Sequence, residues 1–280
     1  MEKKKVTFDT LKVDAHIFKS EPIAKNDTQW QQLKQILLAD SDLYWEIRKD
    51  NQINVYFEGG SIIRLHYCSK HKRMQAFIHE KYIGNKGDKY IDLLAYLESH
   101  NIPLEDIKAN IKANYSQKNG NSKENWSEKY IQSQYILKYR QNYIDSEFAY
   151  KTNEFDIRID LVECVNGEIR FVELKRIDDA RMLKETDATP KVVTQVKDYK
   201  KFISQYKTEI LAYYQKVWDI KQNKLKLPNT PQRPTSIDLE PQLLIFNRWT
   251  KPHTKRDIHT QRMEDILKRE GIDYIIETEI

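Results

Sequence analysis

The sequence predicts an α/β fold built on a mixed sheet, an α+β arrangement in which the strands do not all run parallel. Three observations predict it. Strand-like segments are grouped early in the chain, and a second group near the middle then alternates with helical segments, which is typical of mixed α/β domains. Asn166–Gly167 joins two alternating apolar segments and predicts an antiparallel hairpin. Apolar residues at steps of three and four predict one long amphipathic helix over residues 190–224.

Residues 1–118 are expected to form a separate N-terminal α+β domain. Asp27 and Thr28 can cap a helix that ends near Ala39. Gly59–Gly60 lies between β-rich segments and predicts a hairpin. In chain order, strands are expected over residues 43–48, 53–57, 61–67 and 74–82, followed by helical spacing over residues 91–115, within which Pro103 opens a second short helix. A polar run over residues 116–124 is the predicted linker.

Residues 119–280 are expected to form the second domain. The sequence predicts a helix over residues 123–140. Pro-rich residues 228–241 interrupt the pattern after the long helix. The other expected elements are strands over residues 144–150, 155–165, 168–176, 242–249 and 272–277, and a helix over residues 257–270.

The composition excludes several classes of protein. The chain has 280 residues, of which 32% are charged, and no run approaches eighteen apolar residues, so we expect no membrane-spanning helix. The basic N-terminus lacks the apolar region of a signal peptide. Cys68 and Cys164 lie far apart, which excludes a disulfide scaffold and a cysteine-based zinc site and predicts a cytoplasmic protein.

The charge is balanced overall but uneven along the chain. The 47 basic and 42 acidic residues leave a net charge of +5. Between Arg181 and Lys226, eleven basic residues stand against five acidic ones, a local excess of six. This segment could contact phosphate groups, or it could be the solvated face of a lysine-rich helix.

The hairpin brings two carboxylates together. With a two-residue turn, Val165 pairs with Glu168, and Asp160 then falls opposite Glu173. Like charges opposite one another destabilise a sheet, so either a divalent cation or neighbouring cations must offset them. The second alternative is a surface charge ladder. Four charged side chains would share this face: Arg158, Asp160, Glu173 and Lys175.

The pattern resembles a known family of nucleases. Ile159-Asp160, twelve further residues and Glu173-Leu174-Lys175 are similar to the D…(D/E)xK signature of the PD-(D/E)xK superfamily. Gln195 and Tyr199, on the helix that follows, resemble the QxxxY motif of its RecB-type exonuclease branch. The resemblance covers roughly residues 123–280 and implies a restriction-endonuclease-like core. The first motif departs from the family pattern, because Ile stands where the family has Pro.

The resemblance implies a metal-dependent deoxyribonuclease. Asp160 and Glu173, with Glu128 as a third ligand, would hold Mg²⁺ or Mn²⁺, and Lys175 would orient or activate water. Glu124 and Glu147 are the alternatives to Glu128 for the upstream acidic ligand that the resemblance implies. Gln195 and Tyr199 would contact the substrate or support the site, although Tyr199 also fits the apolar core stripe of its helix. The residues expected to contact the DNA backbone are Arg158, Lys191, Lys197, Lys200 and Lys201.

Two alternatives remain open at this point. The chain could be an inactive nuclease-like module that binds nucleic acid or protein, or a structural protein in which the carboxylates form a charge ladder. The N-terminal domain could serve a homo-oligomer or a protein partner. Its aromatic residues could stack nucleic-acid bases or form the core face of a sheet. They are Tyr44, Trp45, Tyr56 and Phe57.

Overall fold

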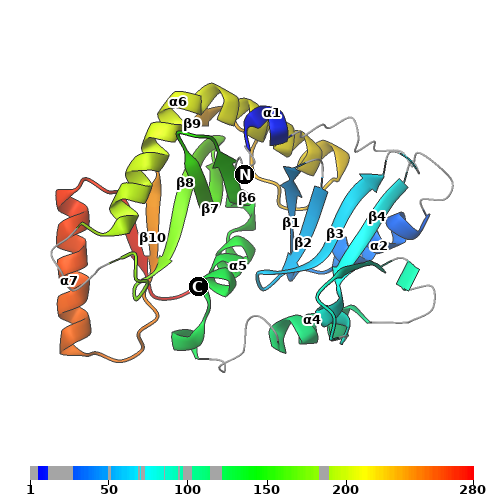
Figure 1. Ribbon diagram of the computed structural model, residues 1–280, viewed down its shortest axis with the longest axis horizontal. Coiled ribbons are helices and arrows are strands. Elements are labelled where there is room, and N and C mark those ends of the chain that lie inside the picture. The colour runs from blue at the N-terminus through cyan, green and yellow to red at the C-terminus, as the bar shows by residue number, and fades with distance from the viewer. Residues whose placement is uncertain are drawn as a thin grey trace.

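The chain forms two sheets with helices packed against both (Figure 1). The computed structural model describes residues 6–11, 28–49, 52–68, 70, 73–84, 86–93, 95–96, 103–113, 122–182 and 189–280. Within these ranges the first sheet has five strands and the second has six. The predicted mixed α/β class is confirmed, and the predicted linker at residues 116–124 lies mostly outside the described residues.

The N-terminal sheet is an antiparallel meander whose strands follow one another in chain order. Its elements are α2 (Thr28–Ala39), β1 (Leu43–Arg48), β2 (Gln52–Phe57), β3 (Gly60–Cys68), β4 (Arg73–His79), β5 (Tyr90–Asp92) and α4 (Leu104–Ile111). The predicted helix at residues 28–39 and the four predicted strands are confirmed within a few residues. Ile91 and Asp92, expected to begin the helical spacing of residues 91–115, end strand β5 instead, where their backbone pairs with β4.

The second sheet combines antiparallel and parallel strands in the order β11–β10–β8–β7–β6. A short helix, α1 (Phe8–Leu11), is the first helix of the described residues. A short strand, β9 (Ser236–Ile237), pairs with β8. The other elements are α5 (Glu128–Lys138), β6 (Tyr143–Lys151), β7 (Asp156–Val165), β8 (Glu168–Arg176), α6 (Lys191–Asp219), β10 (Gln242–Phe246), α7 (Thr254–Arg269) and β11 (Tyr274–Glu277). The predicted elements of this half are confirmed, although α5 begins five residues later than expected.

The β7–β8 hairpin has the predicted turn and register. Asn166 and Gly167 have φ values of 53° and 80°, as the central positions of a type I′ turn require. The ladder begins at Val165–Glu168 and ends at Leu161–Val172. Beyond that point β8 continues beside β10, so that its last residues are flanked by a parallel strand.

Helices cover both faces of the second sheet. The buried side of α5 meets Leu161, Val172 and Leu174 on one face. The other face packs against α6, whose Tyr199, Phe202 and Tyr214 are fully buried. Beyond β10, α7 closes this layer (Figure 1). None of the helices in the described ranges combines the length and the apolar character needed to span a bilayer.

A buried polar joint connects the two sheets. The ammonium of Lys221, just beyond α6, lies 2.8 Å from the Glu46 carboxylate of β1, and both side chains are less than 10% exposed. Beside them the Arg48 guanidinium lies 2.8 Å from Asp145 of β6. Burial raises the pKa of Asp145 to about 7, although Arg48 opposes that shift. Apolar residues of both sheets form one cluster around this joint.

The aromatic residues of the first sheet belong to this packed interior. Tyr44, Trp45 and Phe57 are buried, and Tyr56 stacks on Tyr44 with ring centroids 5.1 Å apart. They therefore pack in the core and at the joint, which agrees with the interpretation that these aromatic residues form the core face of a sheet. At the β2–β3 turn, a Cβ on Gly59 would lie 2.7 Å from the Lys129 carbonyl oxygen, so only glycine lets the hairpin tip approach α5 this closely.

Replacing Lys221 should destabilise the joint strongly. Lys221→Met leaves the Glu46 carboxylate buried without its cation, and we expect the free energy of unfolding to fall by about 3–5 kcal/mol. The double variant Glu46→Gln/Lys221→Met should recover much of this loss. Urea unfolding measures both, with exposed Lys216→Met as the control. Equal stability of the single variant and the control would contradict the role given to the joint.

Candidate active site

The candidate site lies where β7 and β8 separate. The carboxylate of Asp160 accepts a hydrogen bond from the Leu174 backbone N–H at 3.0 Å, in the position where a backbone carbonyl would continue the ladder. The predicted direct pairs Asp160–Glu173 and Arg158–Lys175 are therefore wrong as ladder pairs. The two carboxylates are nevertheless connected, because both contact one further side chain.

That side chain is Lys175. Its ammonium lies 3.1 Å from Asp160 Oδ2 and 2.7 Å from the Leu174 carbonyl oxygen, and it also contacts Glu173 Oε1. A fourth oxygen, Glu128 Oε1, is 3.9 Å away. The side chains of Lys175 and Glu173 are each only 1% exposed, whereas that of Asp160 is 20% exposed. One buried cation thus sits among oxygen atoms, with access to solvent along Asp160.

The group contains three carboxyl groups but only one ammonium. Burial alone lowers the pKa of Lys175, but Asp160, Glu173 and Glu128 outweigh it and hold the pKa above its usual value. Burial raises the pKa of Glu173 to about 8, and the charge of Asp160 adds to the rise. One ammonium can compensate only one carboxylate at this depth, so Glu173, the more buried acid, is the one that keeps a proton.

Two residues of α6 support the same assignment. Gln195 Nε2 donates to Glu173 Oε1 and lies 2.6 Å from the Tyr199 hydroxyl oxygen. That hydroxyl lies 2.8 Å from Glu173 Oε2 and also contacts the Arg158 carbonyl oxygen. A tyrosine hydroxyl has only one proton to donate. If Tyr199 donates to Arg158, then a proton on Glu173 Oε2 completes the hydrogen bonding, so the geometry and the raised pKa agree.

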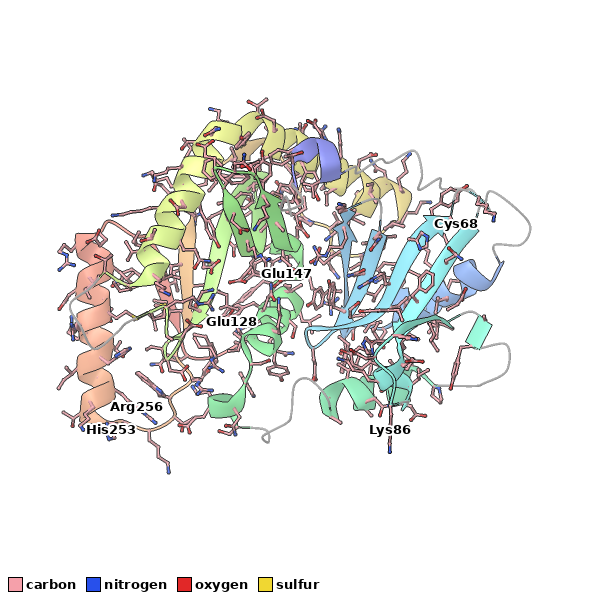
Figure 2. The ribbon with its side chains drawn as sticks, in the orientation of Figure 1. Cys68, Lys86, Glu128, Glu147, His253 and Arg256 are labelled. Atoms are coloured by element: carbon pink, nitrogen blue, oxygen red, sulfur yellow. The ribbon has the colours of Figure 1, made fainter. Side chains whose placement is uncertain are left out.

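Helix α5 brings Glu128 to the site, as expected. Burial raises the pKa of Glu128, with Lys175 opposing the shift. The other two candidates have different partners. Glu147 of β6, labelled with Glu128 in Figure 2, forms an ion pair with Lys129. Glu124 accepts hydrogen bonds from Thr250.

The structure adds residues to the predicted site. Gln132, one helical turn after Glu128, donates to the Asp160 carbonyl oxygen. Its i+4 spacing from Glu128 is the signal that could have identified it. The Leu174 peptide contributes both its N–H and its carbonyl oxygen. Arg181, whose guanidinium lies 3.6 Å from Glu128 and 2.8 Å from Asp179, has no comparable signal in the sequence.

The predicted phosphate-binding lysines are mostly directed elsewhere. With about 100° between successive residues of a helix, Lys197, Lys200 and Lys201 lie roughly 140–240° around α6 from Gln195, and only Lys191 shares its side. Each of the three also has an acidic partner, with separations of 2.7 Å to Glu270, 2.5 Å to Glu240 and 3.4 Å to Asp198. These three lysines therefore lie on the solvated side of the helix, away from Gln195, and their expected contact with the DNA backbone stays a prediction.

Arg158 contacts the site through its backbone and not through its side chain. Its side chain is exposed, and its backbone pairs with Ala149 of β6, on the edge of β7 away from β8. What it contributes to the site is its carbonyl oxygen, which contacts the Tyr199 hydroxyl. The strand therefore positions Tyr199 through Arg158, while the guanidinium lies in solvent.

The oxygen atoms around Lys175 fit a hard cation. Asp160, Glu173 and the Leu174 carbonyl already surround one positive charge, and carboxylate and carbonyl oxygens are ligands that Mg²⁺ accepts. The described part of the chain contains no group of three or more His, Cys, Asp or Glu side chains placed to hold a metal ion. A metal would therefore depend on two carboxylates, a backbone oxygen and water, and would require Lys175 to move aside.

Comparisons with models of protein families, with curated proteins and with solved structures found no match to this chain.

The proton on Glu173 should make stability depend on pH. Because its pKa of about 8 in the folded chain lies above the usual 4.5, its contribution to stability is complete below about pH 4.5 and declines as the pH rises toward 8. Glu173→Gln mimics the protonated acid and should remove this decline, which amounts to at most about 5 kcal/mol. Urea unfolding at pH 5 and pH 8 with chelator measures it. Exposed Glu168→Gln is the control, and an unchanged slope in Glu173→Gln would refute the assignment.

Proposed function

We propose that the chain is a metal-dependent nuclease that hydrolyses phosphodiester bonds in DNA. The observation that carries this proposal is the position of Lys175, whose ammonium meets Asp160, Glu173 and the Leu174 carbonyl oxygen at the end of a hairpin. A pair of carboxylates beside a lysine supplies what phosphodiester hydrolysis needs: oxygen ligands for a cation, and a positive charge next to the attacking water.

Each residue of the site would have its own role in hydrolysis. Asp160 and Glu173 would hold Mg²⁺ or Mn²⁺, with Glu128 near enough to bind one of the metal's waters. The bound metal would act as a Lewis acid on the scissile phosphate and lower the pKa of water. Lys175, released from the centre, would orient the attacking water or stabilise developing charge. Gln195 and Tyr199 position Glu173, since both contact its carboxylate.

A restriction-endonuclease-like core belongs to the same proposal. Its support is the arrangement of the motif residues: Asp160 and Glu173 lie on adjacent strands of a mixed sheet, α5 precedes that sheet, and α6 follows β8 with Gln195 and Tyr199 facing the carboxylates. The order of elements and the polar contacts are those that the resemblance to PD-(D/E)xK nucleases implies.

A second candidate function has its own observation. The ammonium of Lys175 fills the centre where a metal would sit, and the described residues offer no group of three ligand side chains. Both facts are compatible with an inactive nuclease-like module that binds nucleic acid. Titration with Mn²⁺ separates the two candidates, because an inactive site should bind no Mn²⁺ that is lost in Asp160→Asn.

Cleavage of DNA tests the leading proposal. We expect the purified protein to cut linear, circular or single-stranded DNA with Mg²⁺ or Mn²⁺. Cleavage should stop when chelator is added. Lys175→Ala and Glu173→Gln should each lower the rate by at least about 100-fold, since each removes charge stabilisation from the transition state. Lys207→Ala, on the exposed side of α6, is the control. Cleavage that persists in Lys175→Ala, or that ignores chelator, would sink the proposal.

A further inference from the structure

One exposed basic segment follows β10 at the edge of the sheet where the candidate site lies. Residues 247–256, Asn-Arg-Trp-Thr-Lys-Pro-His-Thr-Lys-Arg, contain four basic residues and one histidine but no acidic residue. The segment follows β10 directly and leads into α7. Its position makes it different from the lysines of α6, which lie around the helix from the site.

The register of the sheet places this segment beside the catalytic candidates. Ile245 of β10 pairs with Lys175, and Phe246 pairs with Arg176. The chain therefore leaves the sheet at the carboxyl ends of two parallel strands, which is the edge where ligands bind in open α/β sheets. Lys251 is six residues beyond Ile245, so even a fully extended chain keeps it within about 20 Å of Ile245, and hence within about 25 Å of Lys175 across the ladder.

Internal contacts hold the segment in place. The Arg248 guanidinium lies 2.7 Å from Asp178 and contacts the Glu124 carbonyl oxygen. The Glu124 carboxylate accepts a hydrogen bond of 2.7 Å from the Thr250 hydroxyl. Glu124 lies just before α5, the helix that carries Glu128, so the segment is fixed to an element of the site.

The aromatic residue of the segment is fixed as well. The Arg256 guanidinium lies over the Trp249 ring, 5.3 Å from its centroid, and the His259 ring packs edge-on against the same indole. Two of the four cations, Arg248 and Arg256, are thus engaged within the protein and shape the segment.

The other two cations face solvent. Lys251 and Lys255 are exposed, and so is His253, at the N-terminal end of α7 (Figure 2). Within the described ranges, neither lysine has a carboxylate within ion-pair distance, unlike Lys197, Lys200 and Lys201. A fixed segment whose outward charges are all positive is complementary to a polyanion.

We propose that residues 247–256 bind the phosphate backbone of the substrate strand and lead it to the site at Lys175. The choice of nucleic acid as the partner rests on the proposed function. Each strand of duplex DNA carries a phosphate about every 3.4 Å along the axis, so Lys251 would contact a phosphate within about seven positions of the scissile one, and Lys255 would contact one further along the strand. These contacts set affinity and register without reading sequence.

Fluorescence anisotropy with a labelled DNA duplex, in chelator to prevent cleavage, tests the proposal over a range of salt concentrations. Lys251→Ala/Lys255→Ala should bind more weakly and should lower the slope of log affinity against log salt by about two, close to one for each lost phosphate contact. The matched control is Lys207→Ala/Lys216→Ala, which removes the same charge from exposed positions on α6 and should leave the slope unchanged. Cleavage by all proteins in Mg²⁺ is measured in parallel.

The outcomes separate the two proposals. If Lys251→Ala/Lys255→Ala binds like the wild type, or if both double variants lose affinity equally, the binding surface is overturned even when the wild type cleaves DNA. If only the first pair loses affinity and the wild type cleaves nothing, the surface stands and the catalytic proposal fails. A wild type without salt-dependent affinity for DNA overturns the surface. Selective loss of both affinity and cleavage at subsaturating DNA supports both proposals.

Discussion

The burial of one lysine ammonium between two carboxylates governs the structure around the site. Lys175 and Glu173 are almost completely excluded from solvent, and a charge at that depth is tolerated only when it is paired and hydrogen-bonded. The strands separate after Leu161 and Val172, and Asp160 takes over the Leu174 N–H that the ladder no longer uses. Gln195 and Tyr199 of α6 and Gln132 of α5 contact the other polar atoms of the group, which explains why both helices approach the hairpin there.

Much of this could be predicted because it depends on local rules. The Asn166–Gly167 turn fixes the hairpin register, and that register is enough to bring Asp160 near Glu173. The i, i+4 spacing of Gln195 and Tyr199 places both on one side of α6, and the structure directs that side at the carboxylate. Here a short sequence separation determines the spatial relation, so the pattern alone is informative.

The rest could not be predicted, because it depends on contacts between distant parts of the chain. The β7–β8 ladder ends at Leu161–Val172, and β10, about 70 residues later, pairs with the last residues of β8 along its other edge. The joint of Glu46 with Lys221 connects elements 175 residues apart. Counting charge along the sequence selected α6 as the basic surface, but charge counts do not record which lysines have acidic partners. The segment at residues 247–256 has a smaller excess, yet it combines exposure with a place at the edge of the sheet where the site lies.

The occupied centre also constrains how a metal would enter. Lys175 and the proton on Glu173 together neutralise the charges that a divalent cation would otherwise meet. A cation would therefore have to displace the ammonium and release the proton, and its binding would strengthen as the pH rises toward 8. Tyr199 and Gln195 would remain in place during this exchange, because Tyr199 is anchored to the backbone of β7 through Arg158 and Gln195 contacts both Tyr199 and Glu173. The α6 contacts would thus hold the carboxylate in one position through the exchange of an ammonium and a proton for a metal, as a positioning role requires.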